Sequence, residues 1–207
     1  MAGHGPAIFV GDADALDFLN SIATPVDTTI DWIDSGEGLL TWLEQAEFVP
    51  ADVLKTMRTA ALPGELDKVA LQARDLREWF RGFVRTHKGR PLMLESLDEL
   101  APLNRLLKRD EMFNRIVLMP DAKLVTLALQ TDRRWRSPEA LLLPIGEALA
   151  RFVCTEDFTH VKACEAPACT LLFADHTRGR ARRWCSMAIC GNRAKQAAHR
   201  ERVRARR

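Results

Sequence analysis

Apolar residues in the first 160 positions recur mostly at steps of three and four, the spacing of helices with one buried face. The clearest stripe runs from Leu66 through Val69, Ala73 and Phe80 to Phe83, and Gly89 and Pro91 follow it as a stop signal. Ser96 and Glu99 form a capping box, and Ser137-Pro138 places proline at a first helical position. We therefore predict helices over residues 13–22, 38–48 and 65–88, and further helices beginning at Ser96 and at Ser137.

One segment of this region departs from the helical pattern. Two short apolar runs that contain β-branched residues occur at Ile116–Met119 and Leu124–Leu129. Pro120-Asp121-Ala122 separates them and is typical of a turn. The pattern predicts a β-hairpin.

The charge of the chain is divided unevenly along its length. The net charge is +2, yet residues 1–54 contain ten acidic and no Lys or Arg side chains, whereas residues 176–207 contain 11 Lys or Arg against one Glu. Such asymmetry indicates a polyanionic partner bound by the C-terminal end, with a merely solvated basic tail as the alternative.

The chain lacks the patterns of a membrane or exported protein. No stretch approaches the roughly 18 apolar residues that span a bilayer, and the first Lys or Arg is Lys55, so a secretory start is not indicated. We expect a soluble, cytoplasmic protein with no membrane partner.

Four of the five cysteines form two regularly spaced pairs, C-x4-C, fifteen residues, C-x4-C. This spacing suits a tetrahedral zinc ion held by two knuckles, with a hairpin between them. Leu171–Phe173 and Arg182–Trp184 are the expected strands of that hairpin. Disulfides are less compatible with a reducing compartment, and unpaired core cysteines would not be so regular. We predict one structural zinc per chain, bound by Cys164, Cys169, Cys185 and Cys190, with no open position for catalysis.

A basic helix is predicted directly after the last of these cysteines. Asn192 is a good cap, and the following residues have high helix propensity. Such a helix suits a DNA groove, with phosphate contacts for affinity and base contacts for specificity. We expect Arg193 and Gln196 to face base edges and Arg178, Arg180 and Arg200 to face phosphates. The full set of candidate nucleic-acid contacts is Arg178, Arg180, Arg182, Arg183, Arg193, Lys195, Gln196, Arg200, Arg202 and Arg204. A solvated tail helix is the alternative.

The same residues resemble a known family. RRWCSMAICGNRAK (Arg182–Lys195), together with FAD (Phe173–Asp175) and the first cysteine pair, closely resembles the CGNR-type zinc finger. The segments LDFLNS, LLTWLEQAEFV, LREWF and LNRLL resemble the ABATE domain that precedes this finger in bacterial stress-induced transcriptional regulators. The resemblance covers nearly the whole chain and implies regulation of transcription and DNA binding through the finger.

The N-terminal region offers weaker functional signals. Asp17, Asn20 and Arg77 lie beside or within apolar stripes. Such groups can converge on a small-molecule pocket, but more often they cap helices or pair with each other. The sequence contains no phosphate-binding glycine loop, nucleophile elbow or metal-binding histidine pair, so we expect no enzyme activity.

Together these observations predict a mainly α fold with a small β-hairpin. A helical domain over residues 1–160, which senses an effector or forms a homo-oligomer, precedes a treble-clef-like zinc finger over residues 161–207. The expected partner is double-stranded DNA, and the alternative function is a zinc-stabilised module that binds RNA or protein. We expect the helical domain to remain folded when the zinc site is disrupted.

Overall fold

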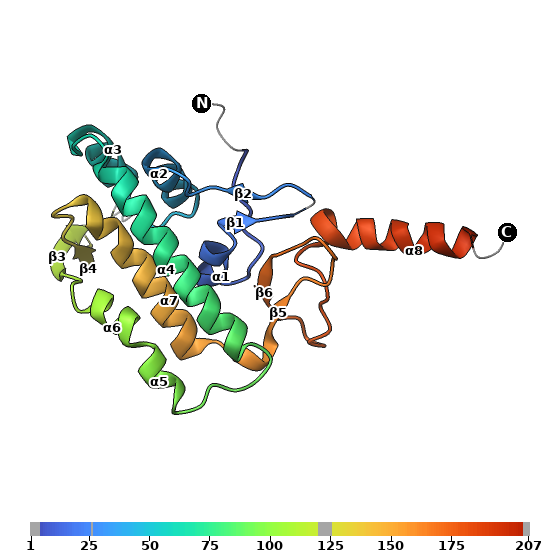
Figure 1. Ribbon diagram of the computed structural model, residues 1–207. Helices are drawn as coiled ribbons and strands as arrows, with labels where there is room; N and C mark the ends of the chain where they lie inside the picture. The colour runs from blue at the N-terminus through green and yellow to red at the C-terminus, as the bar shows by residue number, and fades with distance from the viewer. Residues whose placement is uncertain (1–4, 26, 120–125, 205–207) are drawn as a thin grey trace.

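Two helices form the centre of the molecule, as seen in a computed structural model that describes residues 5–25, 27–119 and 126–204. α4 and α7 pack side by side, with the other helices of the body around them and with α8 projecting from one end (Figure 1). The helices are α1 (Asp14–Leu19), α2 (Gly36–Gln45), α3 (Ala51–Ala60), α4 (Glu65–His87), α5 (Ser96–Glu99), α6 (Ala101–Leu107), α7 (Leu142–Thr155) and α8 (Asn192–Arg204). Among the described residues, no helix is long and apolar enough to cross a membrane.

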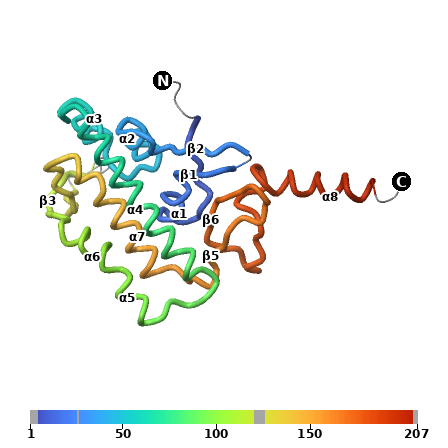
Figure 2. The backbone as a smooth tube through the Cα atoms, in the orientation of Figure 1, coloured from blue at the N-terminus to red at the C-terminus, as the bar shows by residue number. Residues whose placement is uncertain are grey.

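The strands form three separate antiparallel pairs rather than one sheet. The pairs are β1 (Ile22–Ala23) with β2 (Ile30–Asp31), β3 (Met112–Leu118) with β4 (Leu127–Arg133), and β5 (Val161–Ala163) with β6 (Leu172–Ala174). The tube view shows that β1 and β2 lie close to β5 and β6, whereas β3 lies on the other side of α4 and α7 (Figure 2). The mainly helical fold with small hairpins is therefore confirmed.

The predicted stripe of α4 forms the centre of the hydrophobic core. Val69, Ala73 and Phe80 are fully buried along one side of this helix. Near its end, Phe83 packs edge-on to Phe158, with ring centroids 6.0 Å apart. α4 ends at His87, and Gly89 then adopts a positive φ of 80° that favours glycine.

α2 begins at a close contact with α4. Ser35 caps α2 by accepting a hydrogen bond from Gly38 N at 3.1 Å. Gly36 N donates to Asp67 Oδ1 at 2.7 Å, and a Cβ at Gly36 would lie 2.7 Å from the carbonyl carbon of Leu66. Glycine is therefore required for α2 to approach the start of α4.

Two helical details differ from the sequence prediction. α3 was not predicted, because its stripe is sparse and only Leu54 and Met57 are buried. The capping box at Ser96 is wrong, since α5 is a single turn without a side-chain cap and the Ser96 hydroxyl lies 3.5 Å from His87 Nδ1 instead. Pro102 is accommodated in the first turn of the separate helix α6.

The predicted hairpin after α6 is confirmed with longer strands. β3 and β4 pair over seven residues each, from Met112 opposite Arg133 to Leu118 opposite Leu127. The expected turn at Pro120–Ala122, together with Leu124 and Val125, lies outside the described residues.

The hairpin predicted between the cysteine pairs is wrong in its pairing. β6 pairs with β5, Ala163 opposite Leu172, rather than with Arg182–Trp184. The latter segment is not a strand, because its backbone groups bind elsewhere: Arg182 N donates to Asp175 Oδ2 and Glu165 N donates to Arg183 O.

The buried residues on both sides of position 160 form one continuous hydrophobic core. β6 packs against α1, and Asn20 joins them through two hydrogen bonds to Leu172, each 2.9 Å long. The finger strands thus contribute Leu172 and Phe173 to the same core as α1 and α4.

Candidate metal centre and nucleic-acid interface

The four predicted ligand cysteines meet at one point of the C-terminal segment. Cys164 follows β5, Cys169 closes the turn after it, and Cys190 lies in a π-helical turn, Met187–Gly191, directly before α8. The four Sγ atoms all lie within 4.8 Å of one another, and those of Cys169 and Cys185 are 3.9 Å apart. The fifth cysteine, Cys154, is exposed on α7 and does not belong to this cluster.

This geometry fits a tetrahedral zinc ion. A Zn–S distance of about 2.3 Å places the sulfurs of a tetrahedron about 3.8 Å apart. Cys164, Cys185 and Cys190 are buried and Cys169 is half-buried, so the site is largely shielded from water. Cys185 N donates to Cys164 Sγ at 3.3 Å, as backbone amides do when they support a thiolate. The chain holds one structural zinc at this site.

Without the metal ion, the four sulfurs compete for protons. The hydrogen bond from Cys185 lowers the pKa of Cys169 to about 5, and the same contact raises the pKa of Cys185. Burial raises the pKa of Cys190 to about 11. A dication resolves this competition, because it favours the thiolate form of every ligand.

Asp175 is a structural anchor of the finger that sequence reasoning missed. Its carboxylate is fully buried and accepts hydrogen bonds from Lys162 Nζ at 2.7 Å, Thr177 N at 3.1 Å and Arg182 N at 2.9 Å. Burial opposes ionisation, but these donors outweigh it and lower the pKa of Asp175 below its usual range. The signal available in the sequence was the FAD motif (Phe173–Asp175), in which a carboxylate directly follows two buried apolar residues.

Arg182 connects the zinc loop to the N-terminal segment. Its guanidinium donates to the Asp12 carboxylate and to Cys185 O, and also to Val10 O at 3.1 Å. The same group lies over the Phe173 ring, 4.2 Å from its centroid. These contacts occupy the side chain within the protein, so Arg182 is not free to reach a phosphate.

Arg193 supports the cluster rather than projecting from α8. Its Nε donates to Ile189 O at 2.7 Å, and its Nη2 donates to Pro25 O at 2.5 Å and lies 3.5 Å from Cys190 Sγ. The expectation that Arg193 faces base edges therefore conflicts with these contacts. Arg193 lies on the first turn of α8, as predicted, but its side chain points back toward the zinc site.

The other basic candidates divide into partnered and free side chains. Arg180 donates to Asp175 O, and Arg183 donates to Glu165 at 2.6 Å on an exposed surface. Arg202 Nε donates to Ala198 O of its own helix at 3.2 Å. The exposed side chains without a hydrogen-bonding partner in the described ranges are those of Arg178, Lys195, Gln196, Arg200 and Arg204.

α8 exposes these side chains because it makes few contacts with the rest of the protein. None of its residues is buried, and the helix extends away from the body (Figure 1). Arg193, Ala194, Ala197 and Arg200 face the finger across a shallow cavity of about 290 Å³ that Trp184 also lines. Beyond this first contact the helix is surrounded by solvent.

The three polar residues considered for a ligand pocket are engaged within the protein. Arg77 forms a bidentate ion pair with Asp31, at 2.8 and 2.7 Å, and donates to Ser21 Oγ at 3.0 Å. Asp17 accepts a hydrogen bond from Gly11 N at 2.8 Å, and Asn20 binds β6 as described above. Internal pairing, the alternative reading of these residues, accounts for the contacts of all three.

Comparison with known families assigns both parts of the chain. The model described as "CGNR zinc finger" matches residues 160–203. The ABATE model, described as "Putative stress-induced transcription regulator", matches residues 12–156. A search of curated proteins finds no match. The match over most of its length shows that the chain belongs to the ABATE family and carries a CGNR zinc finger at its C-terminal end.

Proposed function

We propose that this regulator binds double-stranded DNA through α8, which the zinc-bound finger holds at a fixed position. One observation carries the proposal: α8 buries none of its residues and extends from the body with Lys195, Arg200 and Arg204 free of partners in the described ranges. A helix of this kind matches the width of the major groove.

The distribution of charge supports the same orientation. Residues 1–54 contain ten acidic and no Lys or Arg side chains, and most of the basic excess lies at the other end of the chain. DNA phosphates would repel the first segment and attract α8, which orients the encounter before contact.

The free side chains suggest separate roles on the duplex. Gln196 is exposed on the second turn of α8 and has the donor and acceptor needed to recognise adenine. Arg200, Arg204 and Arg178 are exposed and suit phosphate contacts. Arg193 and Arg182 act within the finger in this proposal, because their guanidinium groups are already bound.

The zinc ion has a structural role in this proposal. Four thiolates complete its coordination and leave no position for water or substrate, so we propose no catalysis at this ion. Since Arg193 links Cys190 to Pro25, the ion also sets where α8 begins relative to the body.

A charge-matched pair of variants tests the proposal. Lys195→Gln/Arg200→Gln/Arg204→Gln removes three charges from α8, and Lys108→Gln/Arg85→Gln/Arg105→Gln removes three exposed charges from the helical body. Binding of a fluorescent duplex is measured by anisotropy at several salt concentrations. The α8 variant should lower the slope of log affinity against log salt by about 2–3 units, and the body variant should leave it unchanged.

The result also separates DNA from other polyanions. Equal weakening of duplex binding by both variants would mean that α8 is not the contact surface. Tighter binding to structured RNA or to an acidic protein than to the duplex would replace DNA with the RNA- or protein-binding alternative. An effector of the N-terminal domain remains a prediction, and the internal contacts of Asp17, Asn20 and Arg77 give it no support.

A further inference from the structure

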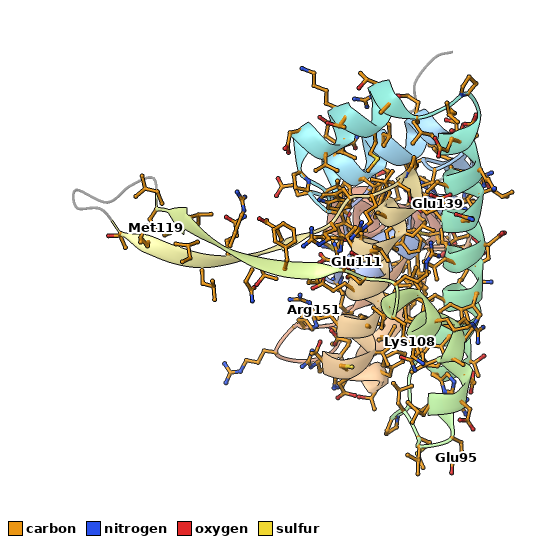
Figure 3. All side chains as sticks on the ribbon, turned by 90° about the vertical axis from the view of Figure 1, so that its left-hand side faces the viewer. Glu95, Lys108, Glu111, Met119, Glu139 and Arg151 are labelled. Atoms are coloured by element: carbon orange, nitrogen blue, oxygen red, sulfur yellow. The ribbon has the colours of Figure 1, made fainter. Side chains whose placement is uncertain are left out.

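The β3–β4 hairpin carries an apolar face that no described part of the chain covers. Ile116 lies opposite Leu129 and Leu118 opposite Leu127, so the four side chains share one face. Their exposed fractions are 71%, 70%, 62% and 63%, respectively. The hairpin projects from the helical body as an arm (Figure 3).

The base of this arm is fixed to the body by ion pairs around one buried arginine side chain. Arg133 forms a bidentate pair with Asp110, both bonds 2.7 Å long, and also binds Glu147 of α7 at 2.9 Å. The Arg133 side chain is buried. At the next position, the guanidinium of Arg134 covers the Phe113 ring, 4.8 Å from its centroid. The arm therefore leaves the body in a defined direction.

An arm of this kind needs another surface to cover it. Two paired strands alone are marginally stable in water, and an exposed apolar strand face favours association. We infer that the face formed by Ile116, Leu118, Leu127 and Leu129 is the interface through which two copies of this chain form a dimer.

The area of the face fits a symmetric dimer. Four residues exposed by about two-thirds present on the order of 450 Å² of largely apolar surface. A two-fold contact counts this face twice and also covers Met112 on the same side of β3, so that the buried total reaches about 1,100 Å², above the roughly 1,000 Å² expected of a specific interface.

The charges of the arm favour a second copy over a charged partner. β3 and β4 contain three charged side chains, and each is paired: Arg115 with Asp132, and Arg133 with Asp110 and Glu147. Two copies of this face therefore meet without unpaired like charges. Because these charges are paired, β3 and β4 have no free charge that an acidic or basic protein could bind.

The proposed interface leaves the basic helix accessible. The hairpin and α8 lie at opposite ends of the molecule in both backbone views (Figures 1 and 2). Dimer formation through the hairpin is thus independent of DNA binding, and either proposal can fail without the other.

Sedimentation of the zinc-loaded full chain without DNA tests the inference. The wild type should be a dimer at about 20 µM, and Ile116→Lys/Leu129→Lys should be a monomer, with dimer affinity reduced at least about 30-fold. The matched control is Leu94→Lys/Leu97→Lys, which places the same charges on exposed apolar residues near α5 and should remain dimeric. Circular dichroism checks that each variant keeps its helical content.

A second variant guards against a hairpin that fails to fold. Leu118→Thr/Leu127→Thr keeps strand propensity while removing apolar area, and it should also weaken the dimer. A wild type that stays monomeric up to about 200 µM would overturn the inference. So would a dimer that persists in folded hairpin variants, or one that the control variant weakens to the same extent.

Discussion

The zinc-bound part of the finger and the helix that follows it differ in almost every structural respect. Residues 161–191 contribute strands, three buried cysteines and Phe173 to the core of the whole molecule. α8 buries no residue and extends into solvent. The boundary between a packed and an unpacked structure thus falls at Asn192, inside the finger, rather than at its start.

This difference shows which basic side chains are available to a partner. Arg182 lies in the packed part and Arg193 at the boundary. Both donate their hydrogen bonds to backbone carbonyls and support the zinc site. Arg200 and Arg204, on the unpacked side, have no partner in the described ranges. A count of positive charges would treat these four residues as equivalent, whereas their contacts assign two to stability and leave two for DNA.

Disruption of the zinc site should have the largest effect on stability. It also tests whether residues 161–191 belong to the packed core. The sequence alone led us to expect that Cys185→Ser would spare the helical body. Because the finger and the body share one core, we now predict that this variant lowers the free energy of unfolding of the whole chain by more than about 3 kcal/mol.

Thermal melting followed by far-UV circular dichroism, with zinc content measured in parallel, checks this prediction. Cys154→Ser is the control, since that cysteine is exposed and outside the cluster. An unchanged helical transition in Cys185→Ser would mean that the body and the finger are energetically separate.

Arg182 and Arg178 provide a sharper test of the same comparison. Arg182→Ala removes hydrogen bonds to Asp12, Val10 and Cys185 and the contact with Phe173, so it should destabilise the protein by about 2–4 kcal/mol. Arg178→Ala should change stability by less than about 0.5 kcal/mol. Urea unfolding in the presence of zinc measures both, and similar losses in the two variants would contradict the division into packed and free arginines.

Asp17 should give the smallest effect, through pH. Burial raises the pKa of Asp17 to about 6, although Gly11 N donates to its carboxylate. The folded pKa then exceeds the unfolded one, so the stability contributed by the protonated form is fully present below about pH 4 and is lost as pH rises through 6. Asp17→Asn removes the charge and keeps an acceptor for Gly11.

The stability of this variant relative to wild type should therefore increase by about 2 kcal/mol between pH 4 and pH 7.5. Urea unfolding at several pH values measures the difference. Asp52→Asn, at the exposed start of α3, is the control. A difference for Asp17→Asn that stays constant with pH would mean that the carboxylate is well solvated.

Local patterns predicted the parts of the fold that depend on neighbouring residues. The stripe from Val69 to Phe83 identified α4, because a helix repeats its buried face every three or four residues. Cysteine spacing identified the zinc site for a similar reason, since each knuckle is a local turn.

Contacts between distant residues were beyond such patterns. β6 pairs with β5 rather than with Arg182–Trp184, because three-residue strands carry too little periodicity to indicate a partner. The orientation of Arg193 depends on Pro25 O, and that of Arg182 on Asp12, each at least 168 residues away along the chain. A sequence shows that these arginines are basic but does not show what they bind.

The central claim is that α8 contacts DNA and that the packed finger only positions it. A chain ending at Ala194 tests it most directly, because it keeps Arg193 and all four cysteines and removes Lys195, Arg200 and Arg204. We predict that this chain binds one zinc, keeps the thermal transition of the full chain, and loses measurable affinity for duplex DNA in anisotropy titrations. Retained duplex affinity in the folded, zinc-loaded truncation would contradict the account and would assign DNA binding to the loop around Arg178 or to the helical body.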